Sequence, residues 1–125
     1  MPQRIRISSG EHSWTAELNE SRSAKALLDL LPTEIAMNRW GDEYYGGAGL
    51  ELGEEPDART EMEVGELAVW PDGQAVCIFF GSTPASHSEE PRAASNVNPI
   101  GRLLDDPTSL KQLGGSITMR FEREG

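Results

Sequence analysis

The sequence predicts a single, mainly β domain that closes, or nearly closes, into an antiparallel barrel. The chain has 125 residues, a common size for one domain with one hydrophobic core. Apolar residues alternate with polar ones in several short stretches, which is typical of half-buried strands. Thirteen glycines and eight prolines are dispersed along the chain and leave little room for long helices or for crossovers between parallel strands. We therefore expect one domain over residues 1–125.

The first eighteen residues are expected to form a β-hairpin. Ile5 and Ile7 alternate with arginines, and Trp14, Ala16 and Leu18 alternate with polar residues. A Ser-Ser-Gly-Glu-His stretch separates the two runs and contains the glycine that a tight turn favours.

The next segment changes from strand to helix periodicity. Its apolar positions follow the i, i+3, i+4, i+7 spacing of an amphipathic helix at Ala24, Leu27, Leu28 and Leu31. Either Asn19 or Ser21 can cap the start of this helix, and Pro32 ends it.

The middle of the chain contains the clearest hairpin. Residues 67–70 and 74–80 are expected to be strands joined by Pro71-Asp72-Gly73, where proline presets the first turn dihedral and glycine accepts positive φ. Before them, two short strands around a turn are expected over residues 35–45, and the acidic segment 51–66 is expected to be a loop.

The last third is expected to contain two strands and a short helix. Residues 81–95 lack periodicity and indicate a loop long enough to suggest a function. A strand follows over 97–104, then a short helix capped by Asp106, and finally a strand over 117–121. The total is about eight strands and two short helices.

The charge excludes some classes of partner. The formal net charge is −10, and the stretch from residue 42 to residue 66 contains nine acidic residues and one basic residue, Arg59. A negative field repels nucleic acid and anionic membrane surfaces, so neither is an expected partner. The acidic cluster is most simply a solvated loop that aids solubility.

Cysteine and histidine usage argues against disulfides, metals and secretion. Cys77 is the only cysteine and lies in an apolar run, so we expect it to be buried without a disulfide. His12 and His87 have no second ligand at metal spacing, and no cofactor motif is evident. The start lacks the apolar stretch of a signal peptide and no membrane-spanning run occurs, so a cytoplasmic location is expected.

Four segments together resemble a known family. They are Trp40-Gly41-Asp42-Glu43-Tyr44-Tyr45, Trp70-Pro71-Asp72-Gly73-Gln74-Ala75, Phe79-Phe80-Gly81-Ser82-Thr83-Pro84 and Asn96-Val97-Asn98-Pro99-Ile100-Gly101. In this order and spacing they are similar to the small prokaryotic cyclophilin-like domain family, over nearly the full chain. The resemblance implies a cyclophilin-type barrel of eight strands with two helices, in a family whose members mostly lack an assigned activity. Cyclophilins carry a Phe-His-Arg tripeptide in their proline pocket, and its absence here argues against prolyl isomerase activity.

The sequence also predicts a ligand pocket at the mouth of the barrel. Its expected residues combine aromatic side chains with a carboxyl, a hydroxyl, an amide and a guanidinium: Trp40, Glu43, Tyr45, Phe80, Thr83, Asn98 and Arg102. Aromatic neighbours can raise the pKa of Glu43 for acid or base work, although Glu43 could equally accept hydrogen bonds from loop amides. Thr83 and Asn98 could likewise be loop cross-links.

We therefore expect a module that binds a small molecule or an extended peptide. The alternative is a peptidyl-prolyl isomerase or another acid/base enzyme, and a purely structural or oligomerising role comes third. An isomerase would need an apolar slot for the proline ring and a donor such as Arg102 or Arg39, whose orientation the alternation does not decide. The ligand and the oligomeric state stay open.

Overall fold

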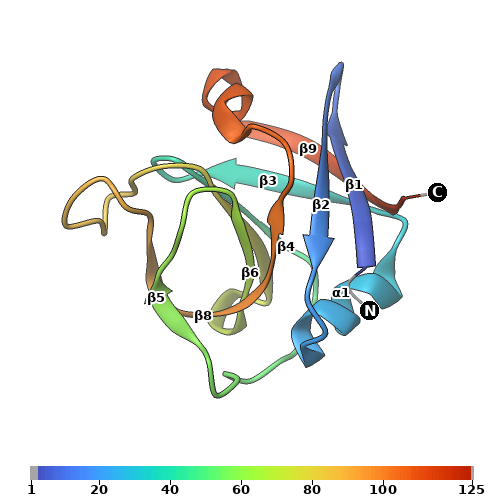
Figure 1. Cartoon of the computed structure of the whole chain (residues 1–125), viewed down its shortest axis with the longest axis horizontal. Helices are drawn as coiled ribbons and strands as arrows, with labels where there is room; N and C mark the ends of the chain where they lie inside the picture. The colour runs from blue at the N-terminus through green and yellow to red at the C-terminus, as the bar shows by residue number, and fades with distance from the viewer. Residues whose placement is uncertain (1–2, 125) are drawn as a thin grey trace.

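The computed structural model describes residues 3–124 and is dominated by strands (Figure 1). In chain order the elements are β1 (Gln3–Ser9), β2 (His12–Leu18), α1 (Arg22–Leu30), β3 (Thr33–Arg39), β4 (Glu43–Gly47), β5 (Arg59–Glu61), β6 (Glu66–Trp70), the 3-10 helix η1 (Pro71–Gly73), β7 (Ala75–Phe79), β8 (Arg92–Leu103), the 3-10 helix η2 (Pro107–Gln112) and β9 (Ser116–Arg123).

Eight of these strands pair into a closed ring. The order is β2-β1-β9-β3-β4-β7-β6-β8, and a pairing between β8 and β2 closes it. Within residues 3–124 every pairing is antiparallel, and the short β5 pairs with β8 alone and stays outside the ring. Because the ring is closed, each of these eight strands has a neighbour on both sides and none is an edge strand. The prediction of a mainly β, cyclophilin-like fold with about eight strands is confirmed.

The main hydrophobic core fills the inside of the ring. It collects buried side chains from all eight ring strands, such as Ile5, Met37, Tyr44 and Phe121, at 1% exposure or less. The two helices η2 and α1 lie towards the top and the bottom of the view in Figure 1. Each adds apolar side chains to the same core, including Leu27 and Leu110. The interior is therefore packed with side chains.

The helix of the first third begins and ends as predicted. The Ser21 side chain accepts a hydrogen bond from the backbone N–H of Ala24, so Ser21 is the N-cap, and its partner candidate Asn19 instead accepts from the Ser21 N–H. Ser23, Ala24, Leu27 and Leu28 form its buried face. The helix ends at Leu30, and Pro32 follows its C-cap residue Leu31.

Two segments expected to be loops contain strand. Residues 59–61 in the acidic segment form β5, and β8 begins at Arg92 rather than at residue 97. The two pair with each other across an irregular register. Neither segment alternates apolar and polar residues in the sequence. They form strands because they pair with each other, and not because one face of each is buried in the core. The second predicted helix is a 3-10 helix, capped by Asp106 as expected.

The β6–β7 hairpin has an unexpected turn residue. Gln74 adopts the left-handed conformation at φ 50°, whereas Gly73 belongs to η1 and has no positive φ. The role of Gly73 is steric: a Cβ at this position would lie 2.5 Å from the Trp70 ring. The prediction that the glycine supplies the positive φ was wrong, since the glycine is needed for a side-chain contact instead.

The acidic segment is anchored to the ring by buried polar groups. The Asn98 amide donates to the Gly53 carbonyl at 2.9 Å and to Ser23 Oγ at 3.0 Å, and its oxygen accepts from the Glu55 N–H at 2.9 Å. The Glu55 carboxylate accepts in turn from the Ser23 hydroxyl. At the other end of the segment, Arg59 forms a bidentate ion pair with Glu66.

In the described part of the chain, no helix is long and apolar enough to span a membrane.

Candidate functional site

A second, smaller apolar cluster lies on the outer face of the ring. Its buried members come from β6, β7, β8 and the segment after β5: Met62, Ala68, Cys77, Phe79, Ala93 and Val97. Tyr45 and Trp70 pack against it. Strand alternation explains the division, because Tyr44 and Ile78 point into the ring and their neighbours Tyr45 and Cys77 point out of it.

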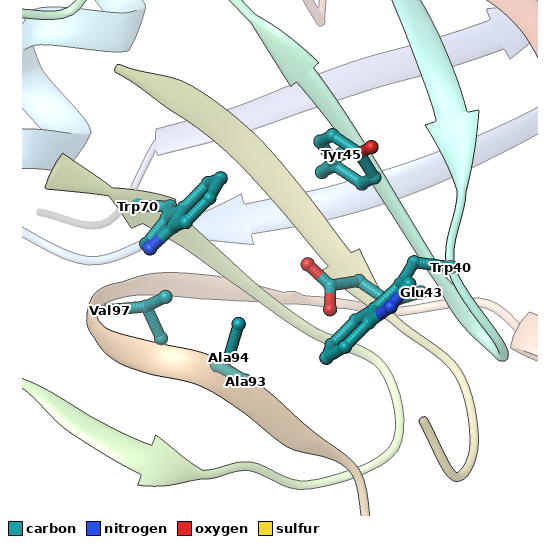
Figure 2. Close-up of a pocket in the computed structure, with 7 residues that line it drawn as sticks. All are labelled: Trp40, Glu43, Tyr45, Trp70, Ala93, Ala94 and Val97. Carbon is teal, nitrogen blue, oxygen red and sulfur yellow. The ribbon is translucent and has the colours of Figure 1, made fainter. Parts of the chain in front are cut away.

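This outer cluster borders a cavity of about 250 Å³. It is lined by Trp40, Glu43, Tyr45, Trp70, Ala93, Ala94 and Val97. Figure 2 shows three aromatic side chains around the Glu43 carboxylate, with the small side chains of β8 opposite them. The cavity therefore lies against the outside of the ring, and not at a barrel mouth.

A tight turn places Trp40 and Glu43 on the same face. The Trp40 N–H donates to the Glu43 carbonyl at 2.8 Å, and the Glu43 N–H donates to the Trp40 carbonyl at 3.2 Å. Residues that exchange hydrogen bonds in this way carry their side chains to one side of a hairpin. Gly41 in the turn has φ 61°, and a Cβ there would lie 2.9 Å from the Thr83 Cα.

Glu43 is a buried carboxyl without a full set of partners. Only 5% of the residue is exposed, and its Oε1 atom has no hydrogen-bond partner among the residues that the structure describes. Burial raises the pKa of Glu43 to about 7, although a hydrogen bond with the Cys77 thiol lowers it. The same burial, together with the nearby Glu43 carboxylate, raises the pKa of the Cys77 thiol well above its usual value. Cys77 is therefore a neutral donor, and Glu43 can exist in both protonation states near neutrality.

The aromatic walls are held in fixed positions. Tyr45 and Trp70 meet edge to face, with ring centroids 6.4 Å apart and planes at 87°. Trp70 Nε1 donates to Ser95 Oγ at 2.7 Å, and the Ser95 hydroxyl donates to Asp72 at 3.1 Å. Since Gly73 also packs closely against the Trp70 ring, the indole has little freedom to rotate.

The structure brings together three of the seven residues proposed from the sequence. Trp40, Glu43 and Tyr45 line the cavity. Trp70 was missed, although its place after Ala68 on the outer face of β6 follows from alternation. The sequence does not identify Ala93 and Ala94, because it predicts a loop over residues 81–95, whereas the structure places both on β8.

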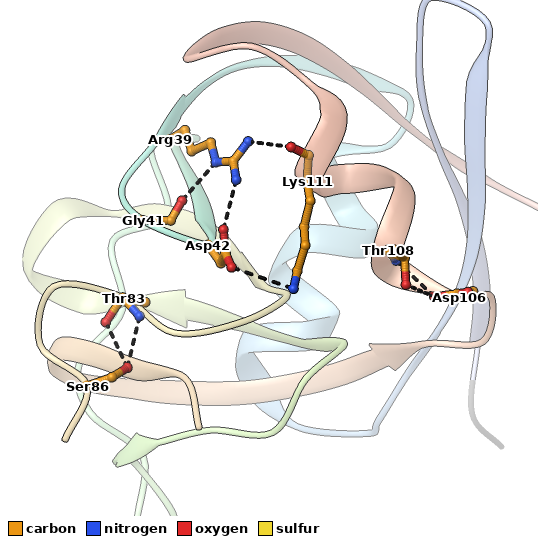
Figure 3. A network of polar contacts seen from close by, with 8 residues as sticks. All are labelled: Arg39, Gly41, Asp42, Thr83, Ser86, Asp106, Thr108 and Lys111. Atoms are coloured by element: carbon orange, nitrogen blue, oxygen red, sulfur yellow. Dashed lines mark hydrogen bonds and ion pairs between the residues drawn. The ribbon is translucent and has the colours of Figure 1, made fainter. Parts of the chain in front are cut away.

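Phe80 lies elsewhere, in the core inside the ring. It is 2% exposed and stacks on Tyr44, with ring centroids 5.5 Å apart. The Arg39 guanidinium lies over the Phe80 ring, 5.2 Å from its centroid. Figure 3 shows the hydrogen bonds that hold the Arg39 guanidinium in place. It donates to the Gly41 carbonyl at 2.8 Å, to Asp42 at 2.8 Å and to the Lys111 carbonyl at 3.0 Å.

The other three residues proposed for the site are also outside the cavity lining. The Thr83 hydroxyl donates to the Arg92 carbonyl, and the Thr83 N–H donates to Ser86, so Thr83 cross-links the loop before β8. Asn98 is fully buried in the anchor of the acidic segment. Arg102 is exposed on β8, opposite Glu17 and Glu66 in the strand pairing.

Metal ligands are not grouped in the described residues. Within residues 3–124, no set of three His, Cys, Asp or Glu side chains lies close enough to hold an ion. The lining of the cavity itself offers one carboxyl, that of Glu43, and three aromatic rings.

Comparison with known proteins agrees with this fold. A family model described as cyclophilin-like matches residues 3–122. The solution structure of a hypothetical protein from Archaeoglobus fulgidus is similar, with 34% sequence identity and a TM-score of 0.82 over 98% of this chain and 95% of that chain. No match was found among curated proteins. With the family model covering nearly all of the ring, the chain belongs to the cyclophilin-like family.

Proposed function

We propose that the protein is a binding module that takes a small molecule, or one side chain of an extended peptide, into the cavity beside Glu43. The observation that carries this proposal is the unpartnered Oε1 atom of a carboxyl that is 5% exposed and faces that cavity. A buried carboxyl oxygen without a hydrogen-bond partner costs free energy of folding, and a ligand can supply the missing hydrogen bond.

The size and lining of the cavity fit a compact ligand. Its volume of about 250 Å³ lies just below the usual range of roughly 300–1,000 Å³ for drug-sized ligands. Apolar walls with one polar group are a common composition for such sites, where the walls supply affinity and the polar group supplies orientation.

A prolyl isomerase of the usual design has less support. The arginine that lies beside an aromatic ring is Arg39, and its guanidinium donates to three carbonyl oxygens and to Asp42. The ring beneath it, Phe80, is 2% exposed. A donor and a ring that are both occupied within the fold are poorly suited to binding an X-Pro amide.

Acid/base catalysis by Glu43 is the second candidate function. The observation in its favour is a pKa of about 7, the range in which a carboxyl can both donate and accept a proton at neutral pH. The protonated carboxyl could then donate to an amide inside the cavity.

An NMR titration of labelled protein tests both candidates. We would add short X-Pro peptides and a set of neutral aromatic and aliphatic fragments, and follow backbone shifts together with cis/trans exchange of the peptides. Binding predicts shifts at Trp40, Tyr45, Trp70 and Val97. Ala94→Phe fills the rim of the cavity and should remove these shifts, while Ala36→Phe, at an exposed position on β3, should not.

The outcomes separate the two candidates. Shifts without exchange support a binding module. Exchange that disappears in Glu43→Gln supports catalysis, and the absence of both shifts and exchange with every probe contradicts both.

A further inference from the structure

We propose that the cavity selects organic cations with an alkylated ammonium head, a ligand class that rests on the proposed binding function. Three features lead to this class: aromatic faces around the cavity, a buried carboxylate within it, and the net negative charge of the protein.

The first feature is the set of aromatic walls. Trp40, Tyr45 and Trp70 line three sides of the space in front of the Glu43 carboxylate (Figure 2). The near-perpendicular planes of Tyr45 and Trp70, at 87°, give a cation two surfaces to contact at once. Aromatic faces attract cations electrostatically, with tryptophan the strongest, and the attraction increases when the cation leaves water.

The second feature is the carboxylate itself. Glu43 Oε1 is buried without a hydrogen-bond partner, and none of the described residues that line the cavity is basic. The protein thus leaves the negative charge of Glu43 uncompensated at this point. A positively charged ligand completes the pair, and the favourable interaction is strong because little water screens it.

The lining also decides between kinds of cation. A lysine ammonium or an arginine guanidinium has several N–H donors, each of which needs an acceptor when it is buried. The cavity offers one carboxylate among mostly apolar groups. An alkylated ammonium has few or no N–H groups and is weakly hydrated, so it loses less on entering such a lining. A compact head of this kind suits a cavity of about 250 Å³.

The third feature is the charge of the surroundings. The protein carries a formal net charge of −10, and acidic residues are concentrated between positions 42 and 66, the segment that begins beside Glu43 and includes β5, which pairs with the β8 wall. Such a field raises the local concentration of cations and their rate of association.

The test compares a cation with its uncharged equivalent. Choline and 3,3-dimethyl-1-butanol have nearly the same shape, but only choline is charged. Calorimetry and NMR titration at pH 8 should show choline bound at the cavity at least about tenfold more tightly than the alcohol, as expected for a desolvated cation on aromatic faces beside a carboxylate. A peptide with one trimethyllysine, compared with choline, distinguishes a peptide source of the cation from a free metabolite.

Two variants locate the effect. Glu43→Gln keeps the shape of the side chain and removes its charge, so it should weaken choline binding about tenfold and leave the alcohol within about twofold. Glu63→Gln removes one exposed charge of the acidic segment and should change neither by more than about twofold.

Each result has a defined meaning. Equal binding of choline and the alcohol at the cavity overturns the selection of cations and leaves the binding function in place. If neither choline nor the trimethyllysine peptide binds there, the inference is also overturned, while the neutral fragments and X-Pro peptides still decide the binding function separately.

Discussion

Asp42 and Glu43 are adjacent in the sequence, but their carboxylates have opposite surroundings. Asp42 accepts a hydrogen bond from Arg39 at 2.8 Å and lies 3.9 Å from the Lys111 ammonium (Figure 3). Glu43 is buried among aromatic rings and has an oxygen without a partner (Figure 2). Asp42 thus stabilises the fold by pairing, whereas the charge of Glu43 opposes folding and is available to a ligand.

The stability of the protein should fall as the pH rises from 4.5 to about 7. Its pKa is raised from 4.5 to about 7 in the folded state, so between these values the folded protein holds a proton that the unfolded chain has released. The stabilisation from this proton is complete below pH 4.5 and is lost as the pH rises through about 7. The loss is on the order of 3 kcal/mol.

Glu43→Gln should remove this dependence. Urea denaturation at pH 5 and pH 8 should show the variant gaining stability relative to the wild type at pH 8, by about 2 kcal/mol. A constant difference between the two proteins at both pH values would show that Glu43 does not titrate in this range.

Arg39→Leu should destabilise the fold by about 2 to 4 kcal/mol. The substitution removes four hydrogen bonds of the guanidinium and leaves the Asp42 carboxylate paired only with Lys111. Urea denaturation measures the loss. Arg120→Leu is the control, because the Arg120 side chain is 47% exposed and forms an exposed ion pair with Glu122, and it should cost less than about 1 kcal/mol. Equal effects would contradict the role given to Arg39.

Asn98→Ala should release the acidic segment. The fully buried amide bonds to the Gly53 carbonyl, the Glu55 N–H and the buried Ser23 hydroxyl, so its removal leaves these three polar groups without this partner, at a cost of about 2 to 4 kcal/mol. Hydrogen exchange of the Glu55 amide should accelerate strongly. Asn96→Ala removes one exposed contact with Glu54 and should leave that exchange rate unchanged. Unaltered protection in Asn98→Ala would disprove the anchor.

Gly73→Ala should weaken ligand binding without contacting the ligand. The added methyl group would lie 2.5 Å from the Trp70 ring and displace this wall of the cavity. We expect a shift of the Trp70 indole N–H resonance and a loss of affinity of about fivefold or more. Gly47→Ala is the control, since a Cβ there meets nothing within 4 Å. A normal Trp70 resonance in Gly73→Ala would contradict this positioning role.

The alternation of apolar residues predicted the ring and the hairpins well, because one face of each ring strand is buried in a common core. It could not place Phe80 or Asn98, which are fully or almost fully buried in the fold and not at the cavity. Three of the cavity residues lie close in sequence at the turn between β3 and β4, so they could be predicted together. The walls from β6 and β8 come from distant segments, and their approach depends on strand pairing that the sequence does not display.

The most direct test of the account follows the side-chain carboxyl carbon of Glu43 by NMR from pH 4 to pH 9, with Glu43→Gln used to assign the signal. The account predicts a midpoint near pH 7 in the free protein. Saturating choline should lower this midpoint, because a cation in the cavity stabilises the ionised form. A midpoint near 4.5 that choline does not move would show an ordinary solvated carboxylate and contradict a ligand cavity built around Glu43.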